Sequence, residues 1–152
     1  MSIFESVSLL PLTEESLNAI SSYGLLGAMG ITLTHFDGER LYGQLEVGDD
    51  HQAPNGYLHA GVVVSLADTL CGIGCQLRLP LGAIGFTTVE LKTNFISTAR
   101  SGTIFGVSNM VHGGRTTQVW DCTVTSGLTG KTMAEFRCTQ LVVYAKSNGE
   151  KA

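Results

Sequence analysis

The stretch NGYLHAGVVVSLADTLCGIGCQLRL, residues 55–79, is the most apolar part of the chain and holds a single acidic residue, Asp68. Its run from residue 60 to 79 is almost long enough for a transmembrane helix, but Asp68 and two glycines interrupt it. Strand-like segments follow it. We therefore expect a buried helix in a globular fold, and no membrane as a partner.

A rotation of about 100° per residue sorts this helix into two stripes. The first carries large side chains and is expected to face a sheet: Leu66, Leu70, Ile73 and Leu77. The second carries mostly small side chains and is expected to line a groove: Gly61, Val64, Ser65, Asp68, Cys71, Gly72 and Cys75. A carboxylate in such a groove either caps a neighbouring element or reaches water, or it serves as a general base or nucleophile.

Segments with strand-like alternation flank the helix. Upstream, residues 13–23 predict a helix capped by Thr13, and a hairpin is expected from strands 30–36 and 40–48. Downstream, four strands are expected at 86–96, 103–111, 116–125 and 131–144. Their short glycine-containing turns favour consecutive antiparallel neighbours. The expected fold class is α+β, with a six-stranded antiparallel sheet curled around the helix.

No internal repeat or linker marks a boundary, so residues 1–152 predict one domain with its core at about 30–144. Charged residues make up only 14% of the chain, which suggests a surface partly covered in an oligomer. The net charge of −4 and the lack of a basic stripe argue against nucleic acid as a partner.

The four cysteines are Cys71, Cys75, Cys122 and Cys138. His51 and His59 lie near the first two in sequence, but no second closely spaced ligand pair exists, so buried reduced thiols are favoured over zinc. The N-terminus, MSIFESVSLLPLTEESLN, lacks the basic region and apolar core of a signal peptide. Both features favour a cytoplasmic protein.

The helix entrance, residues 55–61, combines glycines with His59. Free backbone N–H groups at a helix start favour an oxyanion, while a lone histidine is more often a structural hydrogen-bonding group than a catalyst. Ala60 and Asp68 are eight residues apart, about 12 Å along the axis. A reacting atom must lie within roughly 3 Å of both groups. If both take part, the site is shared by two chains with antiparallel helices.

The segments NGYLHAGVVVSLADT, TTVELKTNFISTARSG and GGRTTQVWDCTV resemble the H-G-G-x-x-x-x-L-A-D signature and adjoining strands of the hotdog-fold acyl-CoA thioesterases. The resemblance is to the phenylacetyl-CoA and 4-hydroxybenzoyl-CoA thioesterase-like branch and covers most of residues 30–144. It implies a long helix wrapped by a six-stranded antiparallel sheet. It also implies a homodimer joined sheet edge to sheet edge, often paired into a tetramer. The implied substrate is an acyl-CoA, with no metal and no organic cofactor.

The resemblance also implies roles for particular residues. Asp68 is the catalytic carboxylate, which attacks the thioester carbonyl or activates a water. Ala60 supplies the N–H that polarises the thioester oxygen, His59 holds the loop and helix start, and Thr88 lies near the nucleophile or water. The expected substrate-binding set, in which Arg115 and Thr116 resemble positions that meet CoA, is Gln52, Asn55, Gly56, Gly61, Arg115 and Thr116.

Two positions depart from the family pattern. Ala60 replaces a glycine, and its backbone donor survives if the residue is helical. Ala53 stands where many relatives carry Asn or Gln six residues before the histidine, which leaves Gln52 or Asn55 to replace it. An aryl- or medium-chain acyl-CoA thioesterase is the favoured function. A hotdog hydratase or dehydratase and a non-catalytic acyl-CoA-binding hotdog protein remain as alternatives.

The acyl pocket is expected to be walled by residues 13–28 and the loop before the long helix. Leu25, Leu26 and Met29 suit an aryl or medium-length acyl group, but they suit a hydrophobic core equally well.

Overall fold

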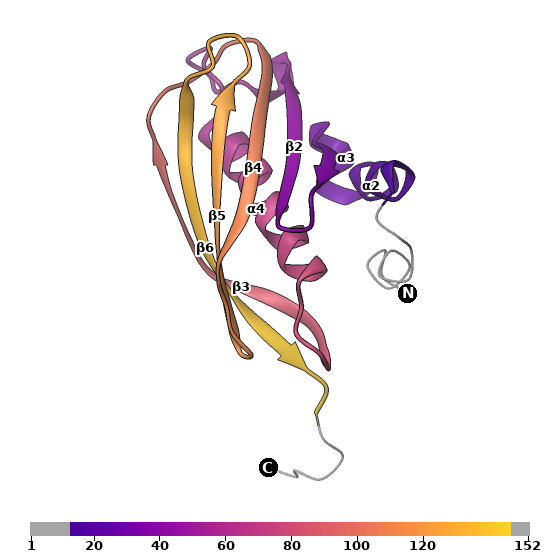
Figure 1. Ribbon diagram of the computed structural model, residues 1–152. Coiled ribbons are helices and arrows are strands. Elements are labelled where there is room, and N and C mark those ends of the chain that lie inside the picture. The colour runs from indigo at the N-terminus through magenta and orange to yellow at the C-terminus, as the bar shows by residue number, and fades with distance from the viewer. Residues whose placement is uncertain (1–12, 147–152) are drawn as a thin grey trace.

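The computed structural model describes residues 13–146, so most of the segment on which the signal-peptide prediction rests lies outside it. The helical elements are α2 (Glu14–Ser21), α3 (Gly24–Met29), the 3-10 turn η1 (Asp49–His51) and α4 (Ala60–Leu77). The strands are β1 (Thr32–Phe36), β2 (Arg40–Val47), β3 (Ala83–Phe95), β4 (Gly102–Gly113), β5 (Thr117–Ser126) and β6 (Thr132–Tyr144). Figure 1 shows the strands curving around α4.

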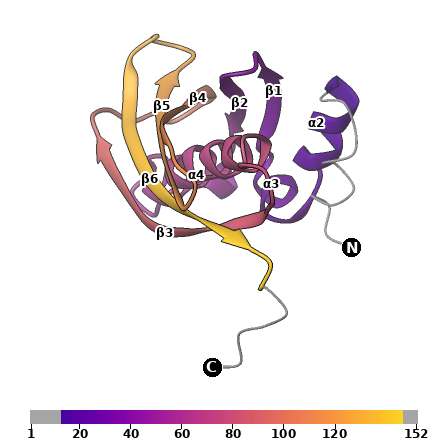
Figure 2. The same cartoon turned by 60° about the horizontal axis from the view of Figure 1, so that its bottom comes forward.

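The six strands form one sheet in the order β1-β2-β4-β5-β6-β3, and every neighbouring pair is antiparallel. Figure 2 shows α4 lying in the concave side of this curved sheet, with α2 and α3 beside β1. The predicted α+β arrangement is confirmed. The β1–β2 hairpin also turns where expected, because Asp37 Oδ1 accepts from the N–H groups of Glu39 and Arg40, and Gly38 adopts a φ of +97°.

One predicted neighbour relation is wrong. β4 follows β3 in the chain but pairs with β2 and β5, whereas β3 pairs with β6 at the edge of the sheet. Residues 96–101 between them are a crossing segment rather than a tight turn. The Ile96 N–H donates to Met133 O at 2.8 Å, and Ala99 O accepts from the Leu58 N–H at 3.1 Å. Within the described part of the chain, β3 therefore keeps one edge unpaired.

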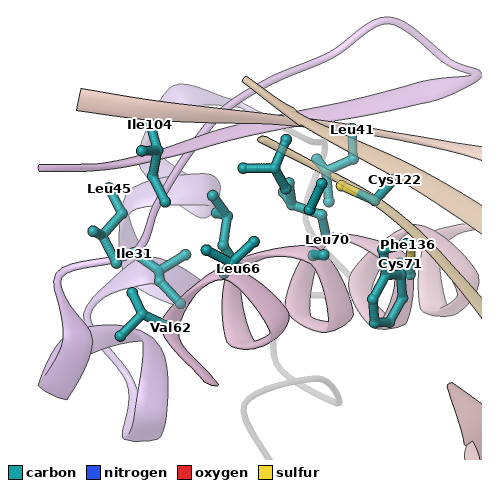
Figure 3. Packing of buried hydrophobic residues seen from close by; sticks show 14 of the residues in the cluster. Ile31, Leu41, Leu45, Val62, Leu66, Leu70, Cys71, Ile104, Cys122 and Phe136 are labelled. Carbon is teal, nitrogen blue, oxygen red and sulfur yellow. The ribbon is translucent and has the colours of Figure 1, made fainter. Parts of the chain in front are cut away.

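The large-residue stripe of α4 faces the core as predicted. Leu66, Leu70 and Ile73 are buried, and Leu77 packs at the margin of the core. Figure 3 shows Leu66 and Leu70 directed from α4 towards the strands. Two strand glycines make room for Leu70, since a Cβ at Gly106 would lie 2.5 Å from a Leu70 methyl and a Cβ at Gly43 would lie 2.8 Å from one.

The small-residue stripe was predicted only in part. Gly61, Val64, Ser65, Asp68 and Gly72 are partly exposed, but Cys71 and Cys75 are fully buried in the core. Figure 3 places Cys71 beside Cys122 and Phe136. The physical reason is that β5 and β6 reach this side of α4, where Cys122 and Cys138 lie close to Cys71.

The N-terminal helices lie against β1 and face α4. Thr13 and Ser16 form a capping box, in which Thr13 Oγ1 accepts from the Ser16 N–H at 3.3 Å and Ser16 Oγ accepts from the Thr13 N–H at 2.9 Å. Ser21 Oγ accepts from the Leu33 N–H at 2.9 Å, which ties α2 to β1. Residues 24–29 lie beyond the helix predicted at residues 13–23. They form the separate helix α3, which ends at Gly30 with φ +67°.

α4 is long and apolar enough to cross a membrane by length and composition alone, yet half of it is buried inside the protein. The sheet supplies that cover, so α4 is the core helix of this fold.

Candidate active site

Asp68 lies in the middle of α4, on the face that the sheet leaves uncovered. Its Oδ1 atom is buried and has no hydrogen-bond partner among residues 13–146. Burial raises the pKa of the carboxyl group above its ordinary value of 3.8. A desolvated carboxylate with a free oxygen has the properties that a general base or a nucleophile requires.

A cavity of about 480 Å³ opens in front of Asp68. Its lining comes from the N-terminal helices, α4 and β3: Ile20, Tyr23, Gly24, Leu25, Leu26, Asp68, Thr69, Gly72, Ile73, Phe86 and Thr88. The structure thus brings Thr88 to the same cavity as Asp68, as predicted. Among the described residues that line the cavity, Asp68 is the one that carries a charge.

Several lining residues were missed from the sequence. Thr69 adds a hydroxyl beside Asp68, and Phe86 closes the cavity from β3. The signal for Thr69 was its place next to Asp68. Gly72, one helical turn beyond the carboxylate, belongs to the stripe that was predicted to line a groove. Tyr23 falls within residues 13–28, which were expected to wall the acyl pocket, but no local pattern indicated Phe86. Of the three residues expected in the pocket wall, Leu25 and Leu26 line the cavity, while Met29 packs against the core.

The start of α4 leaves one backbone donor unused. His59 is the N-cap residue, and its Nδ1 accepts from the Gly61 N–H at 2.9 Å. Gly61 permits this close approach, because a Cβ there would lie 2.9 Å from the same nitrogen. Among the hydrogen bonds of residues 13–146, none takes up the Ala60 N–H. Ala60 therefore presents the free donor at the helix start, and His59 holds the geometry around it.

The loop before α4 is held by its own hydrogen bonds. Asn55 Oδ1 accepts from the Tyr57 N–H at 3.2 Å, and Gly56 turns the chain with φ +76°. The Gln52 side-chain amide donates to Arg100 O at 3.3 Å, which pins the loop to the β3–β4 connection. Gln52 and Asn55, one of which was expected to replace the missing amide at Ala53, are thus both engaged in hydrogen bonds to the backbone.

Arg115 and Thr116 lie at the β4–β5 turn. The Arg115 guanidinium carbon is 6.0 Å from the centre of the Tyr144 ring, and the Tyr144 hydroxyl donates to Arg115 O at 2.6 Å. Thr116 O accepts from the Val142 N–H at 2.9 Å. Neither residue lines the cavity at Asp68, so one chain does not bring this predicted CoA contact to the carboxylate.

The helix start and the carboxylate are also separated within one chain. Ala60 and Asp68 belong to the same continuous helix, and its rise of 1.5 Å per residue sets them about 12 Å apart along the axis. One chain cannot place both groups against the same carbonyl.

The cysteines do not supply a nucleophile. All four are free and buried. Burial, together with the neighbouring Cys122 and Cys138, raises the pKa of the Cys71 thiol well above its ordinary value. Burial and Cys138 raise the pKa of Cys75 to about 12, so neither thiol ionises appreciably at neutral pH. Between residues 13 and 146, no group of three or more His, Cys, Asp or Glu side chains is placed to hold a metal ion.

Comparison with known proteins relates this site to a family. Residues 55–133, just over half of the chain, match the thioesterase superfamily. PA1618 of Pseudomonas aeruginosa, which is named as an esterase, is 33% identical over 129 residues, which are 85% of this chain and 88% of that protein. The 1,4-dihydroxy-2-naphthoyl-CoA hydrolase of Listeria monocytogenes is 32% identical over 116 residues, 76% of this chain and 93% of that one.

A solved structure extends the match beyond residues 55–133. Thioesterase HI1161 of Haemophilus influenzae superposes with a TM-score of 0.83 at 25% identity, covering 93% of this chain and 97% of its own. The long helix in the curved sheet, the carboxylate at its centre and the free donor at its start all lie within this shared fold. The chain belongs to the thioesterase superfamily, and it is a thioester hydrolase with the hotdog fold.

Proposed function

We propose that this protein is an acyl-CoA thioesterase that hydrolyses an aryl- or medium-chain acyl-CoA to the free acid and CoA. The observation that carries the proposal is the Asp68 carboxylate, whose buried Oδ1 has no hydrogen-bond partner in the described chain and whose side chain lines an apolar cavity. The similarity to a hydrolase named for an aryl-CoA substrate supports the same reaction.

Two chemical routes fit the carboxylate. In one, Asp68 accepts a proton from a water that attacks the thioester carbonyl carbon. In the other, Asp68 itself attacks and forms a mixed anhydride, which water then hydrolyses. In both routes the carbon–sulfur bond breaks and CoA leaves as the thiolate. Thr88 lines the same cavity, and the proposal assigns to its hydroxyl the role of holding the carboxylate or the water.

The charge that develops on the carbonyl oxygen needs a donor, and the Ala60 N–H is the free one. Because this donor lies about 12 Å from Asp68 of its own chain, the proposed site takes Ala60 from one subunit and Asp68 from the other. In this arrangement the α4 helices of two copies run antiparallel across a twofold axis.

The edge strand β3 supports a dimer. Its outer edge is unpaired in the described chain, although the strand is 13 residues long. On the side facing α4, Leu91 and Phe95 are 43% and 51% exposed, and the buried Thr93 Oγ1 has no hydrogen-bond partner. A long apolar edge of this kind is normally covered. A second copy of β3 would cover it, and sedimentation equilibrium should give the mass of a dimer or of a tetramer built from two dimers.

The first test is thiol release from a panel of aryl, short-chain and medium-chain acyl-CoAs. Wild type should turn over at least one class, and Asp68→Asn should lose about 10²-fold or more in kcat while still binding the substrate. Glu135→Gln is the matched control, since Glu135 lies on the outer face of the sheet and contacts Thr123. Activity should survive dialysis against EDTA, because the proposed reaction uses no metal and no organic cofactor.

The same assay separates the alternatives. Addition or loss of water on an enoyl or hydroxyacyl chain without thiol release would identify a hydratase or dehydratase. Binding without any turnover would identify a non-catalytic acyl-CoA-binding protein, with Ala53 as the residue that departs from active relatives.

Mixing two variants tests the shared site directly. Ala60→Pro removes the proposed donor at the first helical position, where proline is well tolerated, and His59 already has the extended backbone that precedes proline. Each of Ala60→Pro and Asp68→Asn should be inactive alone. Co-expression should restore about a quarter of wild-type activity, because half of the dimers are mixed and each has one intact site. No restoration would place both groups in one chain's site.

We also propose a cytoplasmic location. The four free cysteines suit a reducing compartment, and fractionation of the native host tests this.

A further inference from the structure

In the cavity at Asp68, Gly72 of α4 lies close to the ring of Phe86. This glycine sits one helical turn after Asp68, on the same exposed face of α4, and a Cβ there would lie 3.2 Å from Cζ of Phe86. A glycine inside a helix costs about 1 kcal/mol relative to alanine. Because Gly72 has no side chain, the narrow space between α4 and the Phe86 ring stays unfilled. We call this space the Gly72–Phe86 gap.

The opposite wall is α3, which is weakly held. Its N-cap residue makes no side-chain capping hydrogen bond, and none of its residues is buried. Leu25 is 57% exposed although it lines the cavity, and Leu26 lies beside it. These residues lie outside residues 55–133, the segment that matches the family model.

The residues that line the cavity disfavour the binding of a charged acyl group. Besides the backbone, its polar groups are the hydroxyls of Tyr23, Thr69 and Thr88 and the carboxylate of Asp68. No lysine or arginine in the described residues lines the cavity. A second carboxylate on the acyl group would be desolvated beside Asp68 without a cation to pair with it.

We propose that this cavity binds the acyl group, that it accepts only uncharged apolar acyl groups, and that the Gly72–Phe86 gap sets their upper size. The proposal rests on the thioesterase function proposed above and names the specificity of its site. The volume of about 480 Å³ lies within the range of small-molecule pockets, about 300–1,000 Å³. Gly72 and Phe86 are specificity-determining residues in this scheme.

The test measures kcat/KM over an acyl-CoA series from acetyl to hexadecanoyl, for wild type and Gly72→Ala. For the longest acyl group that wild type accepts, Gly72→Ala should lose about 10-fold or more relative to hexanoyl-CoA. Gly85→Ala is the matched control, because a Cβ at Gly85, next to Phe86 on β3, meets nothing within 4 Å. It should keep the wild-type chain-length profile. Succinyl-CoA should be turned over at least about 100-fold less efficiently than hexanoyl-CoA by wild type.

A double variant shows whether the effect acts through the ring. The double variant Gly72→Ala/Phe86→Leu should recover most of the kcat/KM that Gly72→Ala loses for the longest acyl group. The shorter leucine side chain reopens the gap. Thermal unfolding of each variant separates a change in specificity from a loss of folded protein. An unchanged length limit in a folded Gly72→Ala variant would overturn the inference, as would the same shift in Gly85→Ala.

A binding measurement keeps this inference separate from the proposed function. Titration calorimetry with non-hydrolysable S-alkyl-CoA thioethers should show the length limit move to shorter chains in Gly72→Ala. If thiol release fails while this shift in affinity appears, the hydrolytic function is wrong and the pocket assignment stands. If thiol is released but Gly72→Ala shifts neither the chain-length profile of kcat/KM nor that of thioether affinity, the function stands and the pocket assignment is wrong.

Discussion

Gly74 determines how closely α4 packs on the sheet, and replacing it should destabilise the protein. It lies on the buried side of the helix, and an alanine Cβ there would lie 2.6 Å from Cζ3 and 2.9 Å from Cη2 of Trp120. Trp120 is fully buried, and its Nε1 donates to Gln118 Oε1 at 2.8 Å. The Gln118 amide in turn donates to Arg78 O at 2.9 Å, at the C-terminal end of α4.

The substitution Gly74→Ala makes contributions of opposite sign to the free energy of unfolding. Gly74→Ala gains about 1 kcal/mol in helix propensity. Overpacking in a closed core costs about 1–3 kcal/mol, and displacing the ring weakens the buried hydrogen bond to Gln118 at a further cost of about 1 kcal/mol. The balance is a loss of about 2 kcal/mol, which for a chain of this length lowers Tm by about 4–8 °C.

The assay is urea unfolding followed by the fluorescence of Trp120, the single tryptophan in the sequence, at one fixed protein concentration. Gly72→Ala is the comparison on the same helix, because its Cβ meets only the far end of the Phe86 ring. It should be the more stable of the two variants. A Gly74→Ala protein as stable as wild type, with unchanged tryptophan emission, would refute the close packing of α4 on β5.

Two further predictions concern stability. Asp68→Asn should be more stable than wild type at pH 7, because burial raises the folded-state pKa of Asp68 and the native state therefore loses stability as pH rises through it. Unfolding measured from pH 7 downwards should show the difference shrink and vanish below the ordinary value of 3.8; a constant difference would contradict the desolvation of Asp68. Thr13→Ala removes the side-chain cap of α2 and should cost about 1 kcal/mol of stability. Thr13→Ser, which keeps the acceptor, should stay near wild type in the same unfolding assay.

Much of the fold was predictable from local patterns. The cap at Thr13, the turn at Asp37-Gly38 and the alternation of the later strands are properties of a few adjacent residues, and the structure confirms each of them. The large-residue stripe of α4 was equally local, because helical periodicity alone assigns it to one face.

The candidate site was predictable where the chemistry stood out against its surroundings. One carboxylate in an apolar helix marked Asp68, and the spacing of Ala60 from it required a second chain for a shared site. The lining residue Phe86 was not predictable, because nothing near it in sequence indicates that it lies at the same cavity as Asp68.

The sequence by itself therefore determined the helix, its N-terminal end and the isolated carboxylate, since each depends on interactions within a few residues. The tertiary structure alone decided that β3 lies beside β6, that Cys71 and Cys75 are buried, and that Phe86 lines the cavity at Asp68. These features depend on strand pairing and sheet curvature between segments distant in the chain, whose contacts form only when the whole sheet closes around α4.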